Sequence, residues 1–323
     1  MNYFSICSGI ECAGVAWHPL GFKPLGFCEI DPFRSAVLNY HYPEVKNYGD
    51  FTKVQKKDIA GISPDVLVGG TPCATFSIAG FRKGISEDRG NLALEFIRLV
   101  ERLNPTWVVW ENVPGILSSN KGKDFATFLG SLAELRYGFS YRVLDTQFIR
   151  TQRFPNAIPQ MRRRVFVVGH IRDWKRTAEV LFDRKILSWN TPPSKEKKQT
   201  TSQKSDSSSQ KCHTPEEKDL IIIHGNFSRV NGDGFRKDGA TYTLTATEIP
   251  SIYQDSIVRR LTPLECERLQ GLPDNYTQIP YKGKSKEDCS ISKRYEACGR
   301  GMSVNVMDFL GNKIKEVHNK YDL

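Results

Sequence analysis

Loops that follow strand-like runs hold the residues best suited to chemistry. Residues 69–73 read GGTPC after the run 65–68, and two glycines with a proline predict a sharp turn that presents Cys73. Cations or backbone N–H groups at such a turn would lower the pKa of the thiol and make it a nucleophile. Glu111 follows another run, 107–110, and the carboxyl ends of parallel strands meet at one sheet edge. We therefore predict that Cys73 and Glu111 share a pocket, with a buried structural cysteine as the alternative.

A loop of small residues near the N-terminus is the candidate ligand site. Residues 7–14 read CSGIECAG after the strand-like run 3–7, and Glu29 ends the next run. An acid there can accept hydrogen bonds from both hydroxyls of a ribose, so the segment predicts a nucleoside site, with a tight loop without a ligand as the alternative. The glycine spacing is not G-x-G-x-x-G and no G-K-[ST] follows, which disfavours nicotinamide and nucleoside triphosphate cofactors.

Strand-like and helical patterns alternate through the first half of the chain, which predicts a mostly parallel sheet covered on both faces. Apolar periodicity assigns strands to residues 3–7, 26–30, 65–68, 107–110, 141–148 and 164–169, and helices to residues 15–17, 32–40, 91–103 and 125–135. Alternation along the last strand places Arg162 and Arg164 on one side. A solvated basic face is the alternative reading of these arginines.

Composition predicts a globular protein with a basic surface. The chain has 323 residues, 39% of them hydrophobic, and a formal net charge of +10, which favours a polyanionic partner. Its apolar runs are far shorter than the roughly 18 residues of a membrane span. The N-terminus lacks the pattern of a secretory signal, so we expect a cytoplasmic protein. None of the eight cysteines forms a C-x-x-C pair, which is typical of reduced thiols.

The second half of the chain is more irregular. Residues 194–212 hold no large apolar side chain and predict a flexible insertion. Short β-like pieces at 220–224 and 240–246, a helix from 262 and a final helix at 304–317 follow. We expect a catalytic and cofactor-binding domain at 1–172, completed by 288–323, and a smaller recognition domain at 173–287.

Taken together, these segments resemble the DNA (cytosine-5)-methyltransferases over nearly the whole chain, and most closely the small phage- and prophage-type members. The resemblance rests on SICSGIECAG, CEIDP, a Gly-Asp pair at 49–50, VGGTPCATFS, RGNLALEF, WENVPGIL, IPQMRRRVFVVG, RLTPLECERLQGLPD and YEACGRGMSVNV. It implies a Rossmann-like fold that uses S-adenosylmethionine, without a metal, to methylate carbon 5 of a cytosine flipped out of double-stranded DNA. We expect a monomer.

The resemblance also implies roles for individual residues. The catalytic residues would be Cys73, which adds to cytosine carbon 6, Glu111 at the ring nitrogen, and Arg164 with Arg162 at the base carbonyl and phosphate. The predicted cofactor-binding residues are Ser8, Gly9, Ile10, Glu29, Ile30, Asp50, Phe51, Pro72, Leu92, Ser303 and Val304. The predicted DNA-binding residues are Ser77, Gln160, Arg163, Thr243 and Thr245.

The sequence departs from the family pattern at three places. Ser-Ile-Cys at 5–7 replaces the usual Asp-Leu-Phe, Ala74 replaces a glutamine, and Arg300 replaces an asparagine. Arginine donates but cannot accept, so we expect cofactor binding weaker by about tenfold at most, and tighter binding in Arg300→Asn. Arg300 could instead pair with the methionine carboxylate or with DNA phosphate.

These departures keep other function classes open. The main alternative is a catalytically impaired DNA-binding homologue. A nicotinamide-dependent oxidoreductase with a structural Cys73 is less favoured, and a metal enzyme least of all, because the histidines are scattered.

Overall fold

A six-stranded sheet forms the centre of the computed structural model, which describes residues 1–72, 92–171, 173–182, 221–224, 235–246, 248–254 and 257–322. The strand order is β2-β1-β3-β4-β6-β5. Neighbours among β1 to β4 run parallel, whereas β6 runs antiparallel to both β4 and β5. The strands are β1 (Asn2–Ile6), β2 (Lys23–Cys28), β3 (Val66–Gly69), β4 (Trp107–Asn112), β5 (Tyr137–Asp145) and β6 (Arg163–Ile171). The predicted mostly parallel α/β sheet is confirmed.

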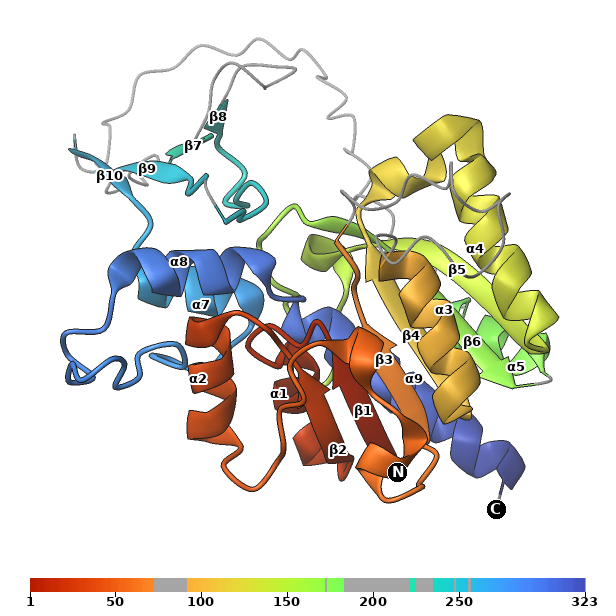
Figure 1. Ribbon diagram of the computed structural model, residues 1–323. Helices are drawn as coiled ribbons and strands as arrows, with labels where there is room; N and C mark the ends of the chain where they lie inside the picture. The colour runs from red at the N-terminus through yellow and green to blue at the C-terminus, as the bar shows by residue number, and fades with distance from the viewer. Residues whose placement is uncertain are drawn as a thin grey trace, which may run out of the picture.

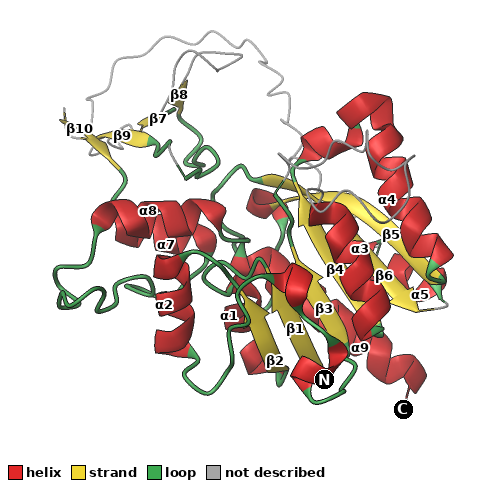
Figure 2. Ribbon diagram, in the orientation of Figure 1, coloured by secondary structure: helices red, strands yellow, loops and turns green. Residues whose placement is uncertain are grey.

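Helices cover both faces of this sheet (Figures 1 and 2). Alternate residues of each strand point to opposite faces, so Tyr3 belongs to one apolar cluster and Phe4 to the other. α3 and α4 lie on the Phe4 side, and α1, α5 and α9 lie on the Tyr3 side. The helices are α1 (Cys12–Trp17), α2 (Pro32–His41), α3 (Leu92–Leu103), α4 (Lys123–Glu134), α5 (Trp174–Leu181), α7 (Pro263–Gln270), α8 (Ile291–Arg300) and α9 (Val304–Asp322).

Local sequence signals fix where several of these helices begin. Asp31 precedes α2, and its Oδ1 accepts from the backbone N–H groups of Phe33 and Arg34, while Pro32 occupies the first helical position. Thr262 and Glu265 form a reciprocal capping box at the start of α7. α2 begins three residues after Glu29, one of the predicted site residues.

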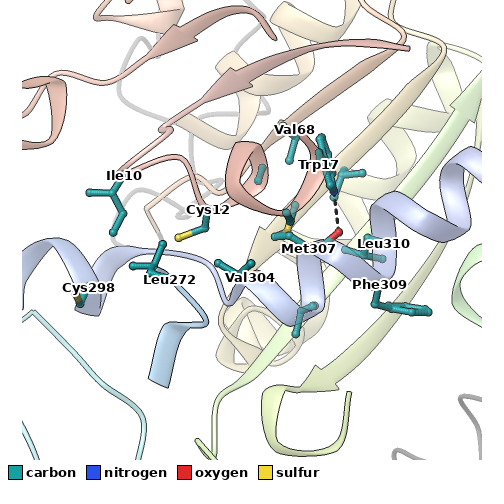
Figure 3. Packing of buried hydrophobic residues seen from close by; sticks show 14 of the residues in the cluster. Ile10, Cys12, Trp17, Val68, Leu272, Cys298, Val304, Met307, Phe309 and Leu310 are labelled. Carbon is teal, nitrogen blue, oxygen red and sulfur yellow. Dashed lines mark hydrogen bonds between the residues drawn. The ribbon is translucent and has the colours of Figure 1, made fainter. Parts of the chain in front are cut away.

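The end of the chain returns to complete the core around its beginning. The indole N–H of Trp17 in α1 donates to the carbonyl of Met307 in α9 at 2.7 Å (Figure 3). Ile10, Cys12, Leu272 and the residues around Met307 belong to one buried apolar cluster. The first and the last helices of the chain therefore share one apolar core.

A second sheet lies on the other side of α7 and α8 from the central sheet (Figure 1). Its antiparallel strands have the order β10-β9-β7-β8, with bounds β7 (Ile221–Ile223), β8 (Phe235–Arg236), β9 (Ser251–Gln254) and β10 (Ile257–Arg260). The β-like piece predicted at 220–224 is confirmed as β7. The piece predicted at 240–246 is wrong as a strand: it is irregular, and Thr241 makes one isolated bridge to Gln160.

α5 belongs structurally to the central sheet, although it follows the boundary predicted at residue 172. The hydroxyls of Ser140 in β5 and Thr177 in α5 are 2.9 Å apart, and Arg142 donates to the carbonyl of Leu181 at 2.9 Å. Residues 194–212, predicted as an insertion, lie outside the described residues. Within the described part of the chain, no helix combines the length and the apolar character that crossing a membrane would need.

Candidate active site

An open cavity of about 640 Å³ lies at the carboxyl ends of β1 to β4. Parallel α/β sheets place their ligands at this edge, because loops leave room there and helix N-termini point N–H groups toward it. Ten of the predicted site residues line the cavity, namely Gly9, Glu29, Ile30, Asp50, Phe51, Pro72, Leu92, Glu111, Arg162 and Arg164. The sheet edge thus brings together most of both predicted sites, catalytic and cofactor-binding.

Glu29 is buried at the end of β2 and organises one side of the cavity. Its Oε2 accepts from the backbone N–H of Gly9 at 2.9 Å, and its Oε1 accepts from Asp31 N–H at 2.8 Å and Arg34 Nη2 at 2.9 Å. Gly9 has φ +58°, which a residue with a Cβ rarely adopts. The carboxylate therefore fixes the first loop, and Glu29 lines the cavity.

Asp50 and the apolar side chains of Ile30, Phe51 and Leu92 line the adjoining part of the cavity. The Oδ1 of Asp50 accepts from the backbone N–H of Thr52 at 3.0 Å. Partial burial raises the pKa of Asp50, but hydrogen bonds such as this one lower it by more, so the pKa lies below its usual value. Phe51 is buried, whereas Ile30 is 75% exposed. An apolar side chain so exposed inside a cavity is suited to cover a flat apolar ligand.

We expect Ile30→Ala to weaken S-adenosylmethionine binding by about tenfold, because an apolar contact worth roughly 1.5 kcal/mol is lost. Thermal unfolding should hardly change, since the side chain is exposed. Calorimetric titration measures the affinity. Ile291→Ala is the matched control, because Ile291 is 60% exposed and does not line the cavity. Equal affinities for Ile30→Ala and the control would contradict the role.

Glu111 and Arg164 form an ion pair on the opposite side of the cavity. Arg164 Nε lies 3.0 Å from Glu111 Oε1, and both side chains are largely buried. A Cβ at Gly70 would lie 2.7 Å from Glu111 Oε2 and 3.0 Å from the Glu111 carbonyl. Gly70 therefore leaves room for the carboxylate, and Arg164 orients it, which holds Glu111 in one position at the sheet edge.

The loop that leads to Cys73 is anchored to β4. The amide of Asn112 donates to the carbonyl of Thr71 at 3.0 Å, and the indole N–H of Trp110 donates to the Thr71 hydroxyl at 3.2 Å. Pro72 lines the cavity beside Glu111. Cys73, the predicted nucleophile, Ala74 and Ser77 lie outside the described residues.

Arg162 lines the cavity, but its guanidinium group is engaged by backbone. It is 4% exposed and donates to the carbonyls of Leu244 at 3.1 Å and Gly301 at 2.8 Å. Burial and the neighbouring Arg164 charge lower its pKa to about 9. These bonds tie the start of β6 to the segments around 244 and 301, so the structure gives Arg162 a positioning role.

We expect Arg162→Ala to lower the free energy of unfolding by about 3 kcal/mol, because two buried carbonyl groups lose their donor. Arg163→Ala is the matched control: Arg163 is the exposed next residue, at the start of β6, and its loss should cost less than about 0.5 kcal/mol. Urea denaturation of the two variants measures the difference. If both variants lose a similarly small part of the free energy of unfolding, the hydrogen bonds of Arg162 contribute little to stability.

Several predicted residues lie away from the cavity. Ile10, Ser303 and Val304 are buried, and Ser303 bonds to Thr146. Gln160 is fully buried and donates to the Leu269 carbonyl at 2.6 Å. Of the other predicted DNA contacts, Arg163 is exposed, and the Thr243 and Thr245 hydroxyls bond to the carbonyls of Met161 and Glu248. The buried residues position neighbouring segments in this structure.

Sequence reasoning missed other residues at the site. Arg34 lines the cavity and pairs with Glu29, and Asn112 holds the Thr71 carbonyl. Arg300 also lines the cavity, although it was singled out only as a departure from the family pattern. Arg34 could have been suspected, because it lies in the first turn of α2, only five residues after Glu29. The hydrogen bond from Asn112 at the end of β4 to Thr71, just after β3, joins residues far apart in the sequence, so no local pattern predicts it.

Glu11 is a further buried acid beside the first loop. It is 1% exposed, and its Oε1 accepts from Gly14 N–H at 3.0 Å at the start of α1. The hydroxyls of Tyr3 and Tyr42 also lie close to Gly14: a Cβ at Gly14 would be 2.8 Å from the Tyr3 hydroxyl and 2.7 Å from the Tyr42 hydroxyl. Burial raises the pKa of Glu11 to about 7, although nearby hydroxyls partly oppose the shift.

We expect a pH dependence of stability from this acid. The folded protein holds a proton that the unfolded chain releases near pH 4.5, so the free energy of unfolding falls as pH rises from there to about 7. Glu11→Gln keeps the bond to Gly14 and cannot ionise, so at pH 8 it should exceed the wild type by up to about 3 kcal/mol. Urea denaturation at pH 5 and pH 8 measures this, and parallel pH profiles of the two proteins would contradict it.

A comparison with solved structures finds other proteins with this fold. A putative DNA modification methyltransferase encoded within an Escherichia coli prophage shares the fold, with a TM-score of 0.63 at 18% identity over 99% of both chains. The two proteins therefore share the mixed α/β fold with a mostly parallel central sheet. The described residues contain no group of three side chains able to hold a metal ion.

The family follows from the sequence comparison. The profile of the C-5 cytosine-specific DNA methylases matches residues 1–316, so the chain belongs to this family. The Type II methyltransferase M1.ScrFI of Lactococcus lactis subsp. cremoris is 29% identical over 95% of this chain and 77% of its own. A protein of Escherichia phage P1 named DNA N-6-adenine-methyltransferase is 30% identical over 97% of this chain. The chain spans 61% of the length of that phage relative.

Proposed function

We propose that the protein methylates carbon 5 of cytosine in specific sequences of double-stranded DNA, with S-adenosylmethionine as methyl donor and Cys73 as covalent nucleophile. The observation that carries this proposal is the shared cavity. Glu29 and Asp50 line it together with the Glu111–Arg164 pair and with Pro72, the residue before Cys73. Family membership supports the same reaction.

The residues of the cavity fit the proposed cofactor. Glu29 and Asp50 offer acceptors for ribose hydroxyls and the adenine amino group, and Ile30, Phe51 and Leu92 offer apolar contact. A small chamber lined by Ser8 and Glu11 adjoins the cavity and provides a further polar position. When bound, S-adenosylmethionine supplies the methyl group.

The chain's own residues prepare the cytosine to accept that group. The Cys73 thiolate adds to carbon 6 of the flipped-out base, while Glu111 donates a proton to the ring nitrogen, so that carbon 5 becomes electron-rich. Arg164 holds the Glu111 carboxylate in place and offers positive charge to the base carbonyl. After carbon 5 is methylated it loses its proton to a base, and the ring nitrogen returns its proton to Glu111. The Cys73 thiolate then leaves as the carbon 5–carbon 6 double bond re-forms.

DNA is the proposed partner of the second sheet. We place recognition within residues 173–287, as the sequence predicts, but assign α5 to the catalytic body because it packs on β5. Arg163 is an exposed cation next in sequence to Arg162 and Arg164, which line the cavity, and the net charge of +10 favours phosphate contacts. The protein would act as a monomer in the cytoplasm of a bacterial or phage-infected cell.

Methyl transfer from labelled S-adenosylmethionine to double-stranded DNA, followed by nucleoside mass spectrometry, tests the proposal. We expect 5-methylcytosine. N6-methyladenine is the second candidate product, because the phage P1 relative carries that activity in its name. DNA binding without any methylated product would instead support the impaired homologue. Sequencing of the methylated positions would then give the recognised DNA word.

A further inference from the structure

The two carboxylate oxygens of Glu29 accept different numbers of hydrogen bonds. Oε1 accepts from the backbone N–H of Asp31 at 2.8 Å and from Arg34 Nη2 at 2.9 Å. Among the described residues, Oε2 has one donor, the backbone N–H of Gly9 at 2.9 Å. A carboxylate has about four acceptor positions, two on each oxygen. Oε1 is therefore saturated, whereas Oε2 keeps one position for a ligand.

The surroundings of Glu29 hold its carboxylate in this orientation. The side chain of Asn47 donates to the Glu29 carbonyl at 3.0 Å and accepts from the Glu29 N–H at 3.0 Å. The Ser35 hydroxyl donates to the same carbonyl at 3.0 Å. With the backbone of Glu29 fixed in this way, its carboxylate cannot rotate to free Oε1 without losing hydrogen bonds at both oxygens.

Of the three donors to the Glu29 carboxylate, Arg34 alone uses its side chain. The Arg34 side chain is 12% exposed and that of Glu29 is 5% exposed, so solvent screens this ion pair little. Nη1 of Arg34 lies 4.0 Å from Glu296 Oε1 in α8, and Arg34 lines the cavity. The guanidinium group is thus held between two acids beside the ligand space, and its removal would free one acceptor position on Oε1.

We propose that Arg34 limits Glu29 to one ribose hydroxyl of the nucleoside ligand, so that Arg34 sets how strongly the protein depends on each hydroxyl. The inference rests on the proposed function, since it assumes that the nucleoside of S-adenosylmethionine occupies the cavity. Sequence spacing alone predicts that Glu29 accepts from both hydroxyls. Because Asp31 and Arg34 saturate Oε1, an acceptor remains for one hydroxyl, and the other gains little from Glu29.

Calorimetry with ribose analogues measures the contribution of each hydroxyl. The ligands are S-adenosylhomocysteine and its 2′-deoxy and 3′-deoxy forms. In the wild type, removal of one hydroxyl should weaken binding by about tenfold, because a hydrogen bond to a charged group is lost, and removal of the other by about twofold or less. In Arg34→Met, which has no side-chain donor, the smaller loss should rise to about tenfold, while the larger loss stays unchanged.

Arg98→Met is the matched control. Arg98 pairs with Glu95, and their side chains are 22% and 8% exposed, but Arg98 does not line the cavity. This variant should show the wild-type loss for each deoxy ligand. Measurable binding of S-adenosylhomocysteine shows that Arg34→Met is folded. Arg34→Ala, which favours the helix and also lacks a side-chain donor, replaces Arg34→Met if the methionine variant does not fold.

The outcomes separate this inference from the proposed function. If the wild-type protein does not bind S-adenosylhomocysteine, the cofactor site itself is wrong and the inference falls with it. If the wild type binds it, but neither loss rises in Arg34→Met, the cofactor site stands and Arg34 does not limit Glu29. If both losses rise together, Arg34 does not act through one acceptor position, and the inference is overturned as well.

Discussion

Replacing Cys73 with alanine should abolish methyl transfer, by a factor of at least about 10³, because no other group in the proposed reaction can add to carbon 6. S-adenosylmethionine affinity should stay within about twofold of the wild type, because the nucleophile acts on the base. Methyl transfer from labelled cofactor and calorimetric titration measure these two quantities. Loss of cofactor binding together with activity would indicate a structural cysteine.

A covalent trap tests the same residue directly. DNA with 5-fluorocytosine at the target position should bind the wild-type protein irreversibly, because carbon 5 cannot lose fluorine as a cation and elimination stalls. Cys73→Ala should form no adduct. The control is Cys7→Ala: Cys7 lines the same cavity, but burial raises the pKa of its thiol to about 12, so it is not a nucleophile near neutral pH. An adduct in Cys73→Ala, or none in Cys7→Ala, would contradict the assignment.

Local patterns predicted the parts of the fold that depend on nearby residues. Short continuous apolar runs located β3 and β4, which are buried on both faces of the sheet. Period-3.6 apolar patterns located α3 and α4, which bury one stripe against that sheet. α2 was predicted from Pro32 near its start. The carboxyl edge of a parallel sheet then placed Glu29 and Glu111 around one cavity, which the structure reproduces.

Elements held by distant partners escaped prediction. α8 is fixed by Arg294, whose Nη2 donates to the buried Glu267 of α7 at 3.0 Å. The pairing of β9 with β10 and β7 likewise depends on tertiary contacts. Nothing local distinguishes a buried arginine that joins two helices from a solvated one.

The same limit applies to side chains of the site. Arg162 and Arg164 alternate on one strand, yet Arg164 pairs with Glu111 while Arg162 donates to the carbonyls of Leu244 and Gly301. Glu11 was grouped with its loop as a small-residue turn, although burial gives its carboxyl group distinct properties. Residue type and spacing identified where the site lies, whereas the roles of individual charges depend on contacts from other segments.

Glu111→Gln should reduce the rate of methyl transfer by about 10²- to 10⁴-fold, the usual contribution of general acid–base catalysis. Glutamine keeps the shape that Gly70 accommodates, but it can neither protonate the ring nitrogen nor pair with Arg164 as a charge. Because protonation assists attack at carbon 6, adduct formation with 5-fluorocytosine DNA should slow together with the rate of single turnovers. The affinity for S-adenosylmethionine should change little.

Glu95→Gln is the matched control for Glu111→Gln. Glu95 is a buried acid of α3 that pairs with Arg98, as Glu111 pairs with Arg164, but it does not line the cavity. It should therefore leave the rate of adduct formation close to that of the wild type. If both variants form the adduct at the wild-type rate, Glu111 takes no part in activating the base, and the acid must come from elsewhere in the cavity. If Glu111→Gln forms the adduct normally but fails to methylate, its role falls after thiol addition, and the proposed order of proton transfer is wrong.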